Sequence, residues 1–408
     1  MVFIPGDPFQ RFTRAGEPIP VQEAASGLWV DAGDLAPYKV ISLKRKAEDR
    51  QKVDVRHPSS ILHFENDFLQ VEFNTDGDIT RVFDKKANQE VLSPNAIANQ
   101  FQAFEDRPIH WDAWDMDIYY DDKMWLAEPA SSIRMVEYGE LRQTIEIRRK
   151  IQNSEFKQRI SLNYNSPRLD FDTSIDWQER HILLKVAFPV DIFAPQATYE
   201  IQWGNVTRAT HRNTSWDWAR FETCAYKWVD LSKGGYGVSL LNDCKYGHDI
   251  HNNIIRITLL RSPTRPDPIA DIGMHQFKYS LFPHAGPWKE DTQREAYLLN
   301  DPIILYQSSV TRKHSSISHY NSLLTCDSPN VIIETVKRAE DGDGIIVRLY
   351  ESQRQRGRVN FRFGGAIDSA WMTNLLEENE SALFVDNDLI RLDIKPYQIV
   401  TMRIKPTS

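Results

Sequence analysis

The 408-residue sequence has few cysteines and no excess of basic charge. Its three cysteines, Cys224, Cys244 and Cys326, are too few and too widely spaced for a disulfide framework or a cysteine metal site. Lys and Arg total 49 against 57 Asp and Glu, and the net charge of −8 argues against a nucleic-acid partner. No apolar run reaches the ~18 residues of a membrane-spanning helix. The first residues, MVFIPGDPFQRF, lack a secretory-signal pattern, so we expect a cytoplasmic protein with no membrane partner.

The common catalytic motifs are missing as well. The sequence has no G-x-S-x-G, no phosphate-binding P-loop, no G-x-G-x-x-G after a strand and no H-E-x-x-H. His248 and His251 flank Asp249, which suggests metal binding, but their spacing does not match a strong zinc motif. We therefore predict that no metal ligand lies in this chain.

Alternation of apolar and polar residues predicts strands along most of the sequence. Residues 69–73 and 79–83, joined by the turn at 74–77, predict a β-hairpin. Helical signals are limited to one turn near 121–126 and a short helix near 290–300. An all-β fold is the prediction. The further predicted strands are 141–151, 157–163, 169–175, 182–190, 236–241, 254–260 and 276–282.

Charged and proline-rich stretches divide the chain into three predicted parts. Residues 1–58 are expected to form a short initial β segment that ends in the charged linker 44–58. Residues 59–290 have the length and strand content of a large β-sandwich. Residues 301–408 are expected to form a smaller C-terminal β-sandwich.

Eleven tryptophans are present, and several gather in two short polar segments. Residues 104–120 (FEDRPIHWDAWDMDIYY) combine carboxylates with Trp and Tyr. Aromatic faces can cover the C–H side of a pyranose while carboxylates accept its hydroxyl protons, which favours a sugar site. A loop anchored to the sandwich by its tryptophans is the structural alternative.

Residues 202–222 interleave Trp with Arg, His, Asn and Asp. A buried ion-pair network between strands would explain this composition as well as a binding loop would. Arg261 stands at the end of the predicted strand 254–260, where a guanidinium can bind two hydroxyls, bind one carboxylate or form a salt bridge.

Several longer motifs together resemble glycoside hydrolase family 38, the retaining zinc α-mannosidases of the cytosolic or vacuolar type. The resemblance spans nearly the whole chain. It is carried by 99–108 (NQFQAFEDRP), 111–115 (WDAWD), 213–222 (NTSWDWARFE), 241–247 (LNDCKYG), 259–263 (LLRSP) and 282–284 (FPH).

The resemblance implies a galactose-mutarotase-like β-supersandwich and the C-terminal half of a hydrolase acting on terminal α-mannosyl residues of oligomannose-type saccharides. In this family the zinc and the aspartate nucleophile belong to an N-terminal α/β catalytic domain, and neither is in this chain. The resemblance therefore implies no catalytic residue and no bound zinc here, and a chain that is inactive alone. Its expected tasks are to complete the sugar pocket and to support oligomerisation, with a homo-oligomer among the expected partners.

By motif position, the resemblance places a substrate-contacting arginine on Arg261 and an aromatic contribution near 111–120. The predicted substrate-binding residues are Arg261, Trp111, Asp112, Trp114, Asp115 and Tyr119. The predicted supporting loop comprises His211, Asn213, Trp216, Asp217 and Arg220.

Two other functions remain open from the sequence. A stand-alone carbohydrate-binding β-sandwich would bind oligosaccharide directly through the Trp and Asp residues of 104–120. A mutarotase-like epimerase would need an acid–base pair facing one pocket, for which His211 and Glu222 are candidates.

Overall fold

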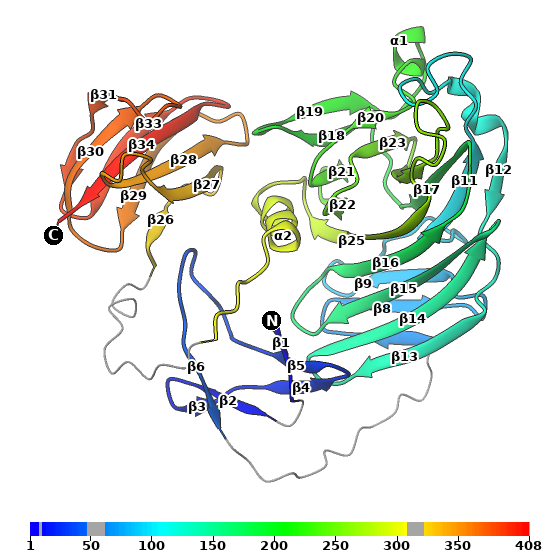
Figure 1. The fold of residues 1–408 in the computed structure, drawn as a ribbon, viewed down its shortest axis with the longest axis horizontal. Coiled ribbons are helices and arrows are strands. Elements are labelled where there is room, and N and C mark those ends of the chain that lie inside the picture. Colours follow the sequence, from blue (N-terminus) through cyan, green and yellow to red (C-terminus); the bar gives the residue numbers. More distant parts are fainter. Residues whose placement is uncertain (8–9, 47–61, 308–321, 408) are drawn as a thin grey trace. The chain divides into compact units, whose positions relative to one another are not determined.

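The computed structural model of the chain describes residues 1–7, 10–46, 62–307 and 322–407 (Figure 1). The chain forms two compact units. The first comprises Met1–Arg50, Gln202–Asn205 and Ile303–Ser408, and the second comprises Gln51–Ile201 and Val206–Pro302. Most of the linker predicted at 44–58, and the predicted boundary at residue 59, lie outside the described residues. In the described part, no helix is long and apolar enough to cross a membrane.

Three antiparallel sheets build the second unit. The nine-stranded sheet has the order β13 (Ser132–Tyr138), β14 (Arg142–Ile151), β15 (Ser154–Asn163), β16 (Leu169–Trp177), β25 (Gly273–Ala285), β22 (Tyr236–Asn242), β21 (Trp228–Lys233), β18 (Gln196–Ile201), β19 (Gly204–Ala209). The six-stranded sheet has the order β12 (Met124–Leu126), β11 (Gln100–Glu105), β17 (Ile182–Pro189), β24 (Ile254–Arg261), β23 (Gly247–His251), β20 (Thr223–Cys224). The third has the order β10 (Gln89–Glu90), β9 (Ile79–Asp84), β8 (Leu69–Phe73), β7 (His63–Glu65).

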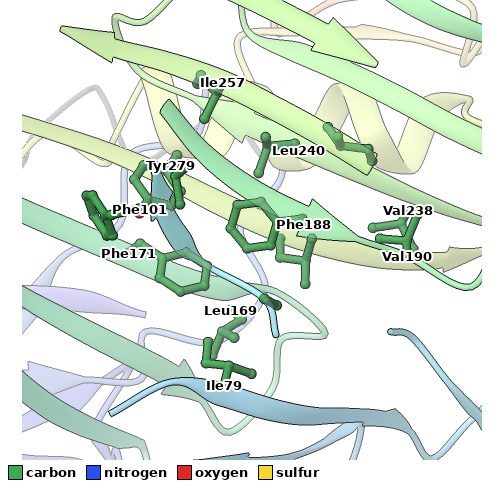
Figure 2. Packing of buried hydrophobic residues seen from close by; sticks show 14 of the residues in the cluster. Ile79, Phe101, Leu169, Phe171, Phe188, Val190, Val238, Leu240, Ile257 and Tyr279 are labelled. Carbon is green, nitrogen blue, oxygen red and sulfur yellow. The ribbon is translucent and has the colours of Figure 1, made fainter. Parts of the chain in front are cut away.

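One hydrophobic core is shared by these sheets, and Figure 2 shows part of it. Phe171 of the nine-stranded sheet meets Phe188 of the six-stranded sheet edge to face, with ring centroids 5.6 Å apart. Tyr279 stacks on Phe171 at 5.0 Å and donates its hydroxyl proton to Asn99 Oδ1 at 2.6 Å. The buried hydroxyl is therefore satisfied, and the ring adds to the apolar interior.

The strand β17 explains why the six-stranded sheet can carry buried chemistry. Its sequence, ILLKVAFP, is apolar on both faces apart from Lys185, and seven of its eight residues are buried. A continuous apolar run of this kind is typical of a strand covered on both sides.

The first unit contains the C-terminal β-sandwich and the N-terminal strands. Its five-stranded sheet has the order β27 (Val331–Arg338), β28 (Ile345–Glu351), β34 (Ile399–Pro406), β30 (Ile367–Thr373), β31 (Asn379–Ala382). The four-stranded sheet has the order β26 (Leu324–Cys326), β29 (Gly357–Phe363), β33 (Leu389–Ile394), β32 (Val385–Asp386), and both sheets line one core. Two three-stranded sheets have the orders β1 (Val2–Pro5), β5 (Gly27–Val30), β4 (Val21–Ala24) and β3 (Glu17–Pro18), β2 (Arg11–Arg14), β6 (Leu43–Lys46).

Helices are few, and the all-β prediction is confirmed, with a large sandwich and a smaller C-terminal one. The predicted short helix is α2 (Glu290–Asn300), whose buried Ala296 packs against Trp228 and Phe282. The turn predicted at 121–126 is wrong in position, because the 3-10 helix η1 (Ile118–Asp122) begins before it and β12 begins at Met124. The helix α1 (Ser215–Trp218) was not predicted, since a single turn has no periodicity to read.

Candidate functional site

Several of the most exposed aromatic side chains of the second unit lie in residues 106–122, here called the aromatic segment, which contains η1 and leads from β11 to β12. Trp111, Trp114 and Tyr119 are 67%, 78% and 69% exposed. The two indoles stack on each other with ring centroids 5.7 Å apart and an interplanar angle of 26°. The carbonyl of Trp111 accepts the N–H groups of Trp114 at 2.7 Å and Asp115 at 2.9 Å, so a tight turn sets this stack.

Arg261, at the end of β24, anchors the aromatic segment from beneath. Its Nε donates to Asp106 Oδ2 at 2.5 Å, and its Nη2 lies 3.4 Å from the other oxygen of that carboxylate. The same guanidinium donates to the backbone carbonyl of Ala113 at 3.3 Å and to that of Asp115. Burial raises the pKa of the Asp106 carboxyl, and the Arg261 guanidinium opposes this rise. Arg261 therefore fixes the segment that carries the tryptophan stack, and its predicted contact with substrate stays a prediction.

Asp112 and Asp115 lie three residues apart in the sequence but differ in environment. Asp112 Oδ2 accepts the backbone N–H of Thr264 at 2.6 Å, its hydroxyl at 3.1 Å and the N–H of Arg265 at 3.1 Å. Burial would raise the pKa of Asp112, but these Thr264 hydrogen bonds outweigh it and lower the pKa below its usual 3.8. Asp115 is exposed, and its carboxylate is available to solvent or ligand.

The residues of the predicted supporting loop lie within 211–222. This stretch is here called the helical segment because it contains α1. Thr214 and Asp217 form a reciprocal capping box at the start of α1. The carboxylate of Asp217 also lies 3.6 Å from His211 Nδ1 and 3.7 Å from Arg220 Nη1, so two predicted residues flank the carboxylate of a third. Trp216 is 77% exposed, and Asn213 is also exposed.

A buried ion network joins residues of both segments, and its members Lys185, Arg256 and Asp121 are not among the predicted site residues. Lys185 is fully buried in β17, and its Nζ donates to Asp249 Oδ2 at 2.7 Å and to Glu222. Arg256 in β24 donates to Asp249 at 2.8 Å and 3.1 Å. Asp121, in the last turn of η1, accepts a hydrogen bond from Arg256 Nη1 at 3.3 Å. The sequence signal for this network is the single lysine inside the apolar run of β17.

Electrostatics in the network follow from burial and pairing. Burial raises the pKa of Glu222 above its usual 4.5, although Lys185 opposes the rise. Despite burial, the nearby Lys185 and Arg256 lower the pKa of Asp249. The backbone of Gly247 in β23 lies close to the Glu222 carboxylate. A Cβ at this position would lie 2.6 Å from Glu222 Oε1.

The described residues do not form a metal centre: within 1–7, 10–46, 62–307 and 322–407, no three His, Cys, Asp or Glu side chains gather as a set able to hold a metal ion. His248 is fully buried in β23, where burial lowers its pKa to about 4, and its Nδ1 lies 3.2 Å from the Tyr246 carbonyl. His251 lies three residues along the same strand, so its side chain points to the opposite face. The described residues therefore do not fit a zinc ion.

The pair proposed for an epimerase is engaged elsewhere. Glu222 accepts hydrogen bonds from Lys185 and from the Thr258 hydroxyl. His211 lies beside Asp217 instead. This arrangement does not present the two groups as an acid–base pair.

Comparison with known proteins gives a consistent assignment. The model "Glycosyl hydrolases family 38 C-terminal domain" matches residues 64–269, half of the chain. The model "Glycosyl hydrolases family 38 C-terminal beta sandwich domain" matches residues 330–402.

Similar proteins point the same way. The chain is 34% identical to alpha-mannosidase 2C1 of Homo sapiens over 85% of the chain and 34% of that protein. It is 33% identical to alpha-mannosidase G of Dictyostelium discoideum over 94% of the chain and 37% of that protein. The chain thus spans about one third of the length of these curated relatives. The crystal structure of an alpha-mannosidase from Enterococcus faecalis has the same fold, with a TM-score of 0.71 at 16% identity, covering 98% of this chain and 51% of that one.

Proposed function

Because the chain belongs to glycosyl hydrolase family 38, we propose that it is the non-catalytic C-terminal portion of a retaining, zinc-dependent α-mannosidase. The proposed substrate is the terminal α-mannosyl residue of an oligomannose-type saccharide, hydrolysed in the cytoplasm. In this proposal the zinc and the nucleophile belong to an N-terminal α/β domain, and this chain completes the sugar pocket and supports oligomerisation.

The stacked pair Trp111–Trp114 is the observation that carries the pocket role. Two exposed indoles held 5.7 Å apart present a flat apolar face of the kind that covers the C–H side of a pyranose. The exposed carboxylate of Asp115 and the hydroxyl of Tyr119 lie in the same segment and can hydrogen-bond sugar hydroxyls. Arg261 holds this segment in place by bonding its backbone carbonyls.

The carboxylates near this surface support a non-catalytic role. A retaining glycosidase needs a nucleophile and a general acid about 5–5.5 Å apart, with the acid's pKa raised. Asp112 has a lowered pKa and is held by Thr264. Asp106 and Glu222 have raised pKa values, but Asp106 is buried against Arg261 and Glu222 is bonded to Lys185. None of these three groups combines the pKa and the access that a general acid requires.

Hydrolysis of p-nitrophenyl α-mannoside tests the catalytic half of the proposal. We expect no turnover by the 408-residue chain alone, with or without added zinc or cobalt. We expect turnover when the chain replaces the corresponding portion of a relative such as alpha-mannosidase G in a chimeric enzyme. Metal-dependent turnover by the chain alone at the rate of that chimera would overturn the proposal.

Substitution of the stacked tryptophans tests the pocket role. In the chimera, we expect Trp111→Ala and Trp114→Ala to weaken transition-state binding by about 1–3 kcal/mol each, read as kcat/KM. Phe384→Ala is the matched control, because Phe384 is an equally exposed aromatic in the C-terminal sandwich. Equal effects of all three substitutions would contradict the assignment.

The exposed stack also favours a second candidate, a carbohydrate-binding module that acts without a catalytic domain. Titration calorimetry of the isolated chain with an oligomannoside distinguishes the two. Binding that Trp114→Ala abolishes, together with an inactive chimera, would favour the module.

A further inference from the structure

Asp121 lies at the end of the aromatic segment, and its two carboxylate oxygens have different partners. Oδ1 accepts Arg256 Nη1 at 3.3 Å, and Oδ2 accepts Arg212 Nη2 at 3.4 Å. Arg256 belongs to β24 of the six-stranded sheet, whereas Arg212 belongs to the helical segment. One side chain therefore joins the two tryptophan-bearing segments to the sheet.

Arg212 also contacts an aromatic ring of the helical segment. Its guanidinium carbon lies 5.4 Å from the centroid of the Trp218 ring, within the range of a cation–π contact. Arg212 is itself mostly buried, since only 17% of its side chain is exposed. Asp121 thus contacts the same guanidinium that packs over the Trp218 indole.

Beneath Asp121 the charges alternate in sign and are largely removed from water. Arg256 is fixed by Asp249, and Asp249 is fixed by the fully buried Lys185. Lys185 also bonds Glu222, the last residue of the helical segment. The helical segment is therefore tied near its start through Arg212 and at its end through Glu222.

Six groups form an unbroken series of alternating charge, three cations and three carboxylates. Buried charges of this kind are stable only when each is paired, so the loss of one member affects its neighbours. The members in order are Arg212, Asp121, Arg256, Asp249, Lys185 and Glu222.

We propose that Asp121 is a positioning residue, which fixes the helical segment relative to the aromatic segment through Arg212 and Arg256. This role concerns the geometry of the two segments and does not depend on sugar binding.

Asp121→Asn tests the proposal with Asp122→Asn as its matched control. An amide offers one acceptor oxygen, and its NH₂ group would face the second arginine. Asp122 is the adjacent, exposed aspartate, so its substitution makes the same charge change without touching the network. The measurement is amide hydrogen exchange of the purified chain by mass spectrometry, with the thermal midpoint recorded in parallel.

We expect Asp121→Asn to accelerate exchange about tenfold in both segments, because a charge-assisted contact holds each of them. Peptides from β17 and β24 are expected to keep their protection, which separates a positioning role from general destabilisation. Asp122→Asn should change neither segment. Acceleration confined to the aromatic segment, or an equal effect of Asp122→Asn, would overturn the proposal.

Arg212→Gln gives a second, independent readout. We expect this variant to accelerate exchange of the helical segment, and we expect Asp121→Asn to add little there in the double variant, because both changes break one contact. Additive effects would overturn the proposal. If Asp121→Asn does not fold, Arg212→Gln decides alone, since unchanged exchange of the helical segment would refute the role. A negative outcome here leaves the proposed mannosidase function standing, because no sugar enters the experiment.

Discussion

Replacement of Lys185 by methionine isolates the charge at the centre of the buried network. Methionine is close to lysine in length and volume, so the change leaves little cavity in the fully buried site. The lost interactions are the contact with Asp249 Oδ2 at 2.7 Å and the contact with Glu222. The perturbation is therefore electrostatic, in a strand whose other side chains are apolar.

The expected magnitude depends on what each carboxylate retains. Asp249 keeps its contact with Arg256 at 2.8 Å, whereas Glu222 keeps an uncharged partner, the hydroxyl of Thr258. Breaking a buried ion pair from one side costs about 3–5 kcal/mol. Protonation of Glu222, whose pKa burial already raises, limits the loss, so we expect about 2–4 kcal/mol at neutral pH. The corresponding fall in the melting temperature is about 4–16 °C.

The sign of the pH dependence follows from Glu222. Without Lys185, the pKa of Glu222 in the folded state rises further above its usual 4.5. When folding raises the pKa of a carboxyl group, its contribution to stability is complete below the pKa of the unfolded state. That contribution is lost as pH rises through the pKa of the folded state. The loss caused by Lys185→Met should therefore be larger at about pH 8 than at about pH 5.

The assay is urea unfolding followed by circular dichroism at both pH values, with Lys150→Met as the control. Lys150 also pairs with a glutamate at 2.8 Å, but half of its side chain is exposed, so we expect its midpoint to match the wild type. A loss below about 1 kcal/mol at both pH values would refute the reasoning. A loss that is larger at the lower pH would refute the assignment to Glu222.

Three further predictions concern other positions. Gly247→Ala should cost about 1–3 kcal/mol of unfolding free energy because its Cβ would lie 2.6 Å from Glu222 Oε1, whereas Gly234→Ala, with nothing within 4 Å, should be near neutral; equal midpoints would contradict this. Arg261→Lys should weaken the coupled circular-dichroism band of the tryptophan stack, because lysine lacks the forked donors that hold the segment's carbonyls. The wild-type unfolding free energy should fall as pH drops from 6.5 towards 4, because burial lowers the pKa of His248 from 6.5 to about 4, and His248→Asn should show a shallower slope.

Local periodicity was sufficient to predict nine strands of the second unit and one helix. The alternation of residues 69–73 and the apolar run at 182–190 correspond to β8 and β17, because a strand's two faces are written directly in its sequence. The short helix predicted at 290–300 corresponds to α2. The turn near 121–126 was misplaced, since η1 depends on packing of Tyr120 against Phe104 rather than on a local pattern.

Partners in the ion network could not be predicted, although one of its members was conspicuous. Lys185 stands alone in an apolar strand, but its partners Glu222 and Asp249 lie 37 and 64 residues further along the chain. The alternative interpretation of residues 202–222 as an ion-pair network agrees with the structure for Arg212 and Glu222, which both form ion pairs. Trp216 of the same stretch is exposed and lies outside the network.

The sequence by itself determined the fold class, the family and the two segments rich in tryptophan and carboxylates, because these properties depend on residue type and short-range order. Only the tertiary structure decided which side chains face solvent and which face the protein. Trp111 and Trp114 point outward as a stack, while Asp112 is bonded inward and Arg261 is occupied by the segment it supports. The physical reason is that the antiparallel pairing of β17, β24 and β23 brings distant charges under the two segments, and each buried charge must then find a partner.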